Sequence, residues 1–151
     1  MSIPKLKDLL IELNPTSKPI PKKPRKVAGV AIVSEGQVLC VKRSETQGKY
    51  PNFWAVPMGH VEDGEKMIQG AHREFKEETM LDIDINSLVY LDTLKDSKYN
   101  RMVGLYKIEL PNKPKPQIDH EHSDWGYFDT DALPHPIEDN LRYTLELKIW
   151  V

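Results

Sequence analysis

The sequence contains a single cysteine, Cys40, among its 151 residues, so no internal disulfide framework can form. Such sparse cysteine is compatible with a reducing compartment, and we expect a cytoplasmic protein. No apolar run is long enough to span a membrane, and Met1 to Asn14 lack the charged-then-apolar order of a signal peptide. The formal net charge of −2 gives no overall attraction to nucleic acid or to a membrane surface. The length suffices for one domain with a hydrophobic core.

The first 25 residues differ in composition from the rest of the chain. Residues 4–13 (PKLKDLLIEL) are compatible with a short amphipathic helix, and Pro15 to Pro24 have the proline and lysine content of an extended linker. The basic residues in and beside the linker have no acidic neighbours: Lys18, Lys22, Lys23, Arg25 and Lys26. We interpret residues 1–25 as a solvated arm, with an anchor for RNA or a partner as the alternative, and residues 26–151 as the folded domain.

Strand-like segments follow the arm. The runs 27–33 (VAGVAIV) and 37–43 (QVLCVKR) flank Ser34-Glu35-Gly36, a sequence typical of a hairpin turn. The first run is apolar at nearly every position, which indicates a strand covered on both faces. Further strands are expected over residues 88–93, 102–110 and 125–128.

Two segments have helical patterns. The first runs from about Glu65 to Thr79, and the second carries an apolar stripe at a spacing of four residues: Ile137, Leu141, Leu145 and Ile149. This stripe should be buried against the sheet. Helices before and after mostly non-alternating strands predict a mixed α/β fold, with the sheet sandwiched between helices.

The first predicted helix carries three glutamates, Glu74, Glu77 and Glu78. On a helix they fall within an arc of about 100°, and Glu78 lies near the edge of the buried side. Like charges so close together repel each other, and a divalent cation would remove that conflict. The alternative is a solvated helix face on which Arg73 and Lys76 neutralise part of the charge. These residues alone leave both interpretations open.

The surrounding segment decides between them. From Gly59 the chain reads GHVEDGEKMIQGAHREFKEETML, preceded by WAVPMGH from Trp54, and this resembles the signature of the Nudix hydrolase family. The matching positions are Gly59, Glu65, Arg73, Glu74, Phe75, Glu77, Glu78 and Leu81. The order of expected strands and helices also agrees with the family over roughly residues 26 to 150.

One position departs from the family pattern. Met80 stands where the family has a glycine, which at a helix C-terminus can take the left-handed conformation without a steric penalty. Met80 should cost about 1 kcal/mol if it takes that conformation. The departure affects stability and loop placement rather than the expected ligands.

The resemblance implies a hydrolase in which water attacks a phosphorus atom of a pyrophosphate linkage. Carried over by position, Glu74, Glu77 and Glu78 would bind Mg²⁺ or Mn²⁺, with the carbonyl of Gly59 completing the set. Glu77 or Glu78 would share proton abstraction with a carboxylate from elsewhere in the chain. Two further positions would have supporting roles, Arg73 by orienting a glutamate of the cluster and Glu65 by bracing the loop. The alternative for both is a surface ion pair.

Beyond this box, DHEHSDW (119–125) precedes a predicted strand. In family members an acidic residue on a late loop often serves as general base or extra metal ligand, and we select Glu121; an ordinary polar loop is the alternative. Arg43 and Arg101 are candidates for binding phosphate oxygens, or else surface charges. His120 and His122 suggest zinc, but a structural zinc site needs four ligands, and Cys40 is distant in sequence.

Substrate choice depends on a weaker signal. Tyr99 lies 18 residues after Leu81, which resembles the placement in the subgroup acting on dinucleoside polyphosphates. Ser97 stands where the ADP-sugar subgroup has proline. The ring of Tyr99 could stack on a base or be an ordinary half-buried strand residue.

We therefore expect hydrolysis of a nucleoside diphosphate derivative, either a dinucleoside polyphosphate or an ADP-ribose-like dinucleotide. The alternatives are a house-cleaning dNTP pyrophosphohydrolase and a non-catalytic nucleotide-sensing or RNA-binding module of the same fold. The expected partner is a small nucleotide-derived molecule rather than a membrane, and a homodimer stays open.

Overall fold

A computed structural model describes residues 23–150. The helix expected over residues 4–13, and all but the last two residues of the linker, lie outside this range. The elements in chain order are β1 (Arg25–Ser34), β2 (Gln37–Arg43), β3 (Trp54–Ala55), β4 (Met58–His60), α2 (Met67–Thr79), the 3₁₀ helix η1 (Ile85–Ser87), β5 (Val89–Asp96), β6 (Arg101–Glu109), β7 (His122–Phe128) and α3 (Asp139–Leu147). Within residues 23–150, no helix is long and apolar enough to cross a membrane.

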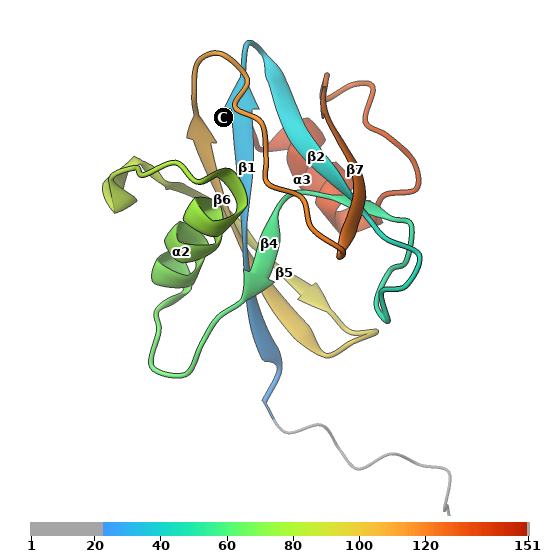
Figure 1. The fold of residues 1–151 in the computed structure, drawn as a ribbon. Helices are drawn as coiled ribbons and strands as arrows, with labels where there is room; N and C mark the ends of the chain where they lie inside the picture. The colour runs from blue at the N-terminus through green and yellow to red at the C-terminus, as the bar shows by residue number, and fades with distance from the viewer. Residues whose placement is uncertain (1–22, 151) are drawn as a thin grey trace, which may run out of the picture.

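The seven strands form one mixed sheet in the order β3-β2-β1-β6-β5, with β4 also paired to β1 and β7 to β2 (Figure 1). β1 and β6 run parallel along most of their length, from Arg25 opposite Arg101 to Val33 opposite Glu109. On its other edge β1 pairs with β2 only near Val33 and Ser34, and with β4 at residues 27–29. The divergence of β1 and β2 leaves room for β4, which places Gly59 opposite Ala28 of β1.

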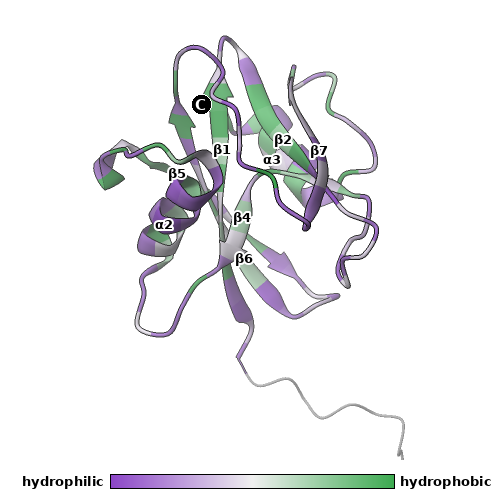
Figure 2. Ribbon diagram, viewed as in Figure 1, coloured by the Kyte–Doolittle hydropathy of each residue, from purple (hydrophilic) through white to green (hydrophobic). Residues whose placement is uncertain are grey.

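Strand β1 is buried on both faces, as its continuous apolar run predicts. Alternate side chains enter two separate cores, because successive residues of a strand point to opposite faces. Ala28, Val30 and Ile32 pack with Ala71 and Phe75 of α2. On the opposite face the core contains Val27, Ala31, Val33, Leu141 and Leu145. The predicted mixed sheet between helices is confirmed, and β1 and β2 are strongly apolar at its centre (Figure 2).

The four apolar residues of the predicted C-terminal stripe are all buried, at 0 to 7% exposure: Ile137, Leu141, Leu145 and Ile149. The helix itself covers only Asp139–Leu147, so the first and last of the four extend the buried stripe beyond it. Glu138 caps this helix by accepting a hydrogen bond from the backbone N–H of Leu141 at 3.1 Å.

Met80 ends α2 in the left-handed conformation, with φ 60° and ψ 14°. Its backbone N–H donates to the carbonyl of Lys76 at 2.7 Å, which closes the last turn of the helix. The side chain is 71% exposed and therefore gains little from packing. A residue with a Cβ in this conformation costs about 1 kcal/mol relative to glycine. The helix thus ends where the family glycine would end it.

Candidate active site

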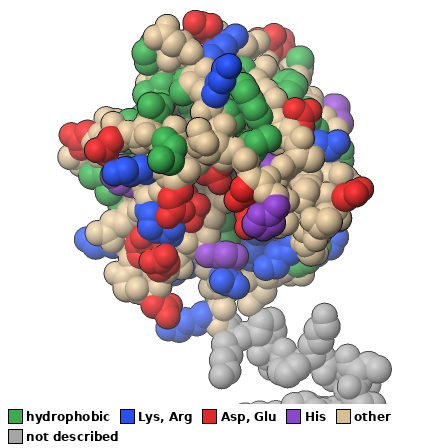
Figure 3. Space-filling model, in the orientation of Figure 1, with side chains coloured by type: hydrophobic (Ala, Val, Ile, Leu, Met, Phe, Trp, Pro, Cys, Tyr) green, Lys and Arg blue, Asp and Glu red, His purple; other side chains and the backbone are tan. Residues whose placement is uncertain are grey.

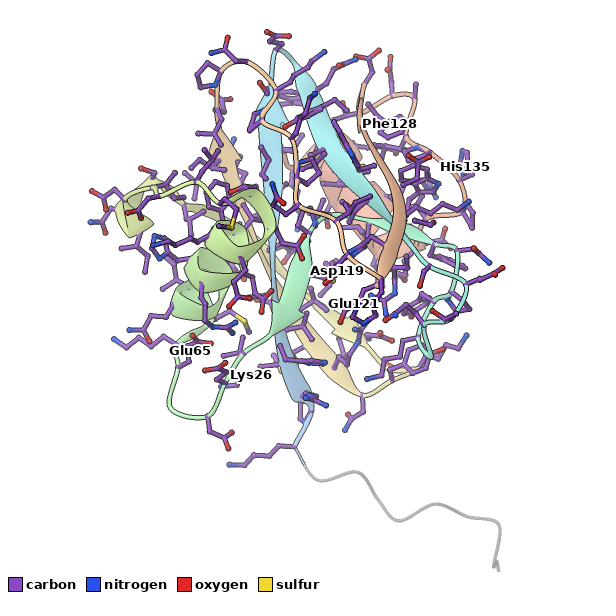
Figure 4. The ribbon with its side chains drawn as sticks, in the orientation of Figure 1. Lys26, Glu65, Asp119, Glu121, Phe128 and His135 are labelled. Carbon is purple, nitrogen blue, oxygen red and sulfur yellow. The ribbon has the colours of Figure 1, made fainter. Side chains whose placement is uncertain are left out.

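Carboxylates from separate segments of the chain line one cleft. Helix α2 supplies Glu74, Glu77 and Glu78, and the loop between β6 and β7 supplies Asp119 and Glu121. The remaining lining residues are Met58, Gly59, His60, Glu62, Arg73 and Gln117. Asp119 and Glu121 lie between β4 and β7 (Figure 4), and acidic side chains gather over α2 and the centre of this face (Figure 3). Residues far apart in sequence therefore form one acidic cleft.

Arg73 connects the cleft to the loop before α2. Its Nε and Nη2 donate to the two oxygens of Glu65 at 3.0 and 3.1 Å, a fork that fixes the plane of the guanidinium. Its Nη1 donates to Glu74 at 2.8 Å and to Glu77 at 3.4 Å. Nη2 also donates to the carbonyl of His60 at 2.9 Å. These contacts are the ones that the orienting and bracing roles would require.

Gly59 lies against the carboxylate of Glu74. A Cβ at position 59 would lie 2.1 Å from Cδ of Glu74 and within 2.4 Å of both its oxygens. Any other residue at this position would therefore displace the glutamate. The close approach places the backbone of β4 directly beside the acidic helix face.

Glu78 carries the clearest electrostatic conflict of the site. Its Oε2 is buried and, among the described residues, has no hydrogen-bond partner. Burial raises the pKa of this carboxyl from 4.5 to about 7, with further contributions from the negative charges of Asp119, Glu74, Glu121 and Glu77. A buried polar atom without a partner is rare in folded proteins and needs an explanation.

The charged form of Glu74 is also disfavoured. Burial raises its pKa, the hydrogen bond from Arg73 opposes that shift, and the charges of Glu77 and Glu121 add to it. Its side chain is 15% exposed, whereas that of Glu77 is 58% exposed. The three helix glutamates therefore range from nearly buried to open.

The donor set fits a hard divalent cation. The carboxylate and carbonyl oxygens of this cleft are the ligand types that Mg²⁺ prefers. The unpartnered oxygen of Glu78 and the close contact of Gly59 with Glu74 are features that a cation ligated by these groups would account for. As placed in residues 23–150, no three His, Cys, Asp or Glu side chains converge as a metal-holding group.

A basic chamber adjoins the cleft and shares Met58, Gly59, His60 and Glu121 with it. Its other lining residues are Val27, Arg43, Gln47, Gly48, Lys49 and Arg101. Arg43 donates from Nε to the carbonyl of Lys49 at 2.7 Å. Burial lowers the pKa of Arg43, and the positive charge of Arg101 lowers it further. Two guanidiniums thus face the same space.

An apolar cavity adjoins this chamber and shares Arg43, Met58 and Arg101 with it. Three aromatic side chains line it, Tyr50, Phe53 and Trp54, and the start of α3 contributes Glu138 and Asn140. Tyr99 does not line this cavity. It lies in the turn after β5, with its ring edge-on to Tyr50 at 5.0 Å between centroids.

The structure thus gathers most of the residues singled out from the sequence. Gly59, Arg73 and the three helix glutamates share the cleft with Glu121, Glu65 lies behind Arg73, and the chamber contains Arg43 and Arg101. Sequence reasoning missed Asp119 and the aromatic cavity. Asp119 belongs to the quoted DHEHSDW segment, but nothing in the spacing separates it from Glu121. Tyr50 and Phe53 carry no motif.

Comparison with known proteins agrees with this geometry. A model of the NUDIX domain matches residues 22–147. A MutT NUDIX hydrolase from Burkholderia pseudomallei superposes with a TM-score of 0.70 at 25% identity, covering 83% of this chain and 98% of that one. An Ap4A hydrolase from C. elegans, solved as a binary complex, gives a TM-score of 0.57 at 27% identity, covering 70% and 81%.

Two curated relatives differ in how much of their length is matched. The nucleoside triphosphatase NudI of Escherichia coli is 27% identical, with 78% of this chain and 91% of the relative aligned. The m7GpppN-mRNA hydrolase NUDT17 of Xenopus laevis is 41% identical, but over only 35% of this chain and 19% of the relative. The chain therefore spans about a fifth of the length of that second relative.

The fold and the matched relatives define a hydrolase of the pyrophosphatase type. The chain belongs to the NUDIX domain family.

Proposed function

We propose that this protein hydrolyses the pyrophosphate linkage of a nucleotide-derived molecule at the acidic cleft. The side chains of Glu74, Glu77 and Glu78 and the carbonyl of Gly59 would hold the divalent cation, Mg²⁺ or Mn²⁺. The observation that carries the proposal is the buried, unpartnered oxygen of Glu78 among four other carboxylates. Burial, together with the negative charges of those carboxylates, raises the pKa of Glu78 to about 7. Such a site is unfavourable unless it serves to bind a cation or to move a proton.

When bound, the cation supplies neutralisation of phosphate charge and a lowered pKa for the attacking water. The protein's own side chains accept the proton and orient the cluster. Glu121, on the loop facing α2, accepts the proton of the water, an action that Glu77 or Glu78 shares. The water oxygen forms a bond to phosphorus as the bridging P–O bond breaks, and the bridging oxygen leaves with the other phosphate. Arg73 holds Glu74, and Glu65 holds Arg73, so the cluster keeps its orientation.

The acidic cleft, the basic chamber and the apolar cavity adjoin one another, and together they would hold a nucleotide. Arg43 and Arg101 in the basic chamber would bind phosphate oxygens, as planar guanidinium donors do well. The apolar cavity beyond them would take a nucleobase against Tyr50, Phe53 and Trp54. The scissile phosphate would then lie at the acidic cleft, which shares Met58, Gly59, His60 and Glu121 with the chamber.

We propose a dinucleoside polyphosphate or an ADP-ribose-like dinucleotide as substrate, supported by the spacing of Tyr99 and by the similarity to an Ap4A hydrolase. A nucleoside triphosphate is the second candidate, because the alignment with NudI covers 91% of that relative. A non-catalytic sensor would not need the complete glutamate set, and an RNA-binding module would rest on an arm of which residues 1–22 lie outside the described range. The presence of only one cysteine, Cys40, in the sequence supports our proposal of a reducing, cytoplasmic location.

The test is phosphate release from a panel of dinucleoside polyphosphates, ADP-ribose, nucleotide sugars and dNTPs, with and without Mg²⁺. A marked preference for two-base substrates would support the first candidate, and a preference for dNTPs the second. No turnover of any substrate in Mg²⁺ or Mn²⁺ would contradict the enzymatic proposal.

A further inference from the structure

We propose that Asp96 is a positioning residue that joins the phosphate-binding chamber to the wall of the base-binding cavity; this inference rests on the function proposed above. Asp96 is the last residue of β5 and pairs in register with Arg101, the first residue of β6. It holds Arg101 in the chamber and Tyr50 in the cavity wall at the same time. Binding of the phosphates and of the base would then depend on one carboxylate.

Both oxygens of Asp96 are engaged. Oδ2 accepts hydrogen bonds from Nε and Nη2 of Arg101 at 3.1 and 2.9 Å. Oδ1 accepts from the hydroxyl of Tyr50 at 3.1 Å and from the backbone N–H of Tyr99 at 3.3 Å. Tyr50 lies 46 positions earlier in the chain, on the loop between β2 and β3. The carboxylate therefore connects two segments that are distant in sequence.

The ion pair of Asp96 with Arg101 is nearly buried, with side-chain exposures of 12% and 11%. Burying two charges costs solvation energy that their attraction recovers only in part, so such a pair is weak evidence for a role in stability. A role in placing the guanidinium explains its position better. Within the described residues, Nη1 of Arg101 makes no hydrogen bond and stays available as a donor.

The positive charge of Arg43 lies beside that of Arg101, and Asp96 is needed to keep Arg101 in place. Arg43 and Arg101 line the same two spaces, and their like charges repel each other. Burial lowers the pKa of Arg43, and the positive charge of Arg101 lowers it further. The negative charge of Asp96 offsets this repulsion from the side of Arg101. Without that charge, Arg101 would move away from Arg43, and two convergent phosphate donors would become one.

The aromatic side of the connection is equally specific. The ring of Tyr50 packs against Phe53 at 5.3 Å and Tyr99 at 5.0 Å between centroids. The guanidinium of Arg101 lies 5.8 Å from the centroid of Tyr50 and 5.9 Å from that of Tyr99, within cation–π range. Tyr99 thus supports Tyr50 from behind, and Tyr50 presents its ring to the cavity.

Two ligands, one with a base and one without, distinguish the contact of Asp96 with Arg101 from its contact with Tyr50. Dissociation constants are measured for a nucleoside triphosphate and for tripolyphosphate, which has no base, on the full-length protein and on Asp96→Asn and Tyr50→Phe. Asp92→Asn is the matched control, because Asp92 lies on the same strand in a 2.6 Å ion pair with Lys148 and lines neither space. Melting temperatures accompany each variant, and kcat and KM are measured for the best substrate of the panel.

We expect Asp96→Asn to weaken both ligands by about tenfold, the scale of one charge-assisted contact, and to raise KM far more than it lowers kcat. Tyr50→Phe should weaken the nucleotide by about threefold and leave tripolyphosphate unchanged, because only the hydroxyl contact is lost. Asp92→Asn should change neither constant. If Asp96→Asn does not fold, Tyr50→Phe and Asp96→Glu carry the same comparison.

The inference is overturned if Asp96→Asn folds and binds both ligands within twofold of the unmodified protein. It is also overturned if Tyr50→Phe weakens tripolyphosphate as much as the nucleotide. A protein that hydrolyses no panel member but shows these binding differences would contradict the proposed function and support the role of Asp96.

Discussion

Nη1 of Arg73 lies 2.8 Å from Oε1 of Glu74, while Nε and Nη2 of the same guanidinium hold Glu65. One side chain thus links the loop before α2 to the acidic cleft. We expect Arg73→Lys to raise the Mg²⁺ concentration needed for half-maximal activity by about 10- to 100-fold, as loss of an outer-shell partner typically does. Lysine keeps the charge but cannot form the fork.

The control for Arg73→Lys is Arg142→Lys on α3, where the arginine pairs with Asp139 and Glu146 at 3.5 and 3.4 Å on the surface. Activity should not change in that variant. An unchanged Mg²⁺ requirement in Arg73→Lys would mean that the guanidinium does not orient the cluster.

The raised pKa of Glu78 predicts a pH-dependent stability of the protein in chelator. The folded state holds the proton up to a pKa of about 7, whereas the unfolded state releases it near 4.5. The folded state therefore binds more protons between these values, and stability falls as pH rises through this window. Glu78→Gln should flatten this decline and be more stable than the unmodified protein at pH 8. Denaturant unfolding in chelator at pH 5, 6, 7 and 8 measures the free energy of unfolding of both proteins. If that free energy changes with pH by the same amount in both, the pKa of Glu78 is not raised in the folded state.

Met80→Gly should raise the free energy of unfolding by up to about 1 kcal/mol, because glycine takes the left-handed conformation without a Cβ penalty. Met80→Ala is the matched control, since alanine removes the exposed side chain but keeps the Cβ. Urea denaturation compares the two. Equal stability of both variants would show that the conformation of Met80 carries no cost.

Residues 1–22, which make up most of the arm, should be dispensable for chemistry. Pairing of β1 with β6 begins at Arg25 opposite Arg101, so a shortened protein that starts at Lys23 keeps every strand and helix of the described fold. We expect kcat and KM for small substrates within about twofold of the full chain, as for a segment outside the site. A folded but inactive shortened protein would assign the arm to the active site or to a dimer that forms it.

The long elements of the fold could be predicted because each contains enough residues to show its pattern. Residues 27–33 form a continuous apolar run, and the C-terminal stripe places four apolar residues at a spacing of four: Ile137, Leu141, Leu145 and Ile149. β3 and β4 contain two and three residues, too few for any period to be visible, and their partners are distant in sequence.

The candidate site also contains some residues that the sequence predicts and others that it does not. Glu74, Glu77 and Glu78 lie on one helix turn, so their proximity follows from the sequence alone. The cavity wall of Tyr50, Phe53 and Trp54 needs the sheet to bring a loop beside α3, and the contact of Asp96 with Tyr50 crosses 46 positions. No spacing rule reports such contacts, which arise only when the chain folds.

The central claim is that hydrolysis depends on a divalent cation held by the helix glutamates. The most direct measurement is turnover of the best panel substrate in chelator and after Mg²⁺ is restored, for the unmodified protein, Glu77→Gln and Glu78→Gln. We expect chelator to abolish turnover without unfolding the protein, Mg²⁺ to restore it, and each substitution to lower the restored rate by about three or more orders of magnitude. Turnover at full rate in chelator, or near-normal rates in both folded variants, would contradict the claim.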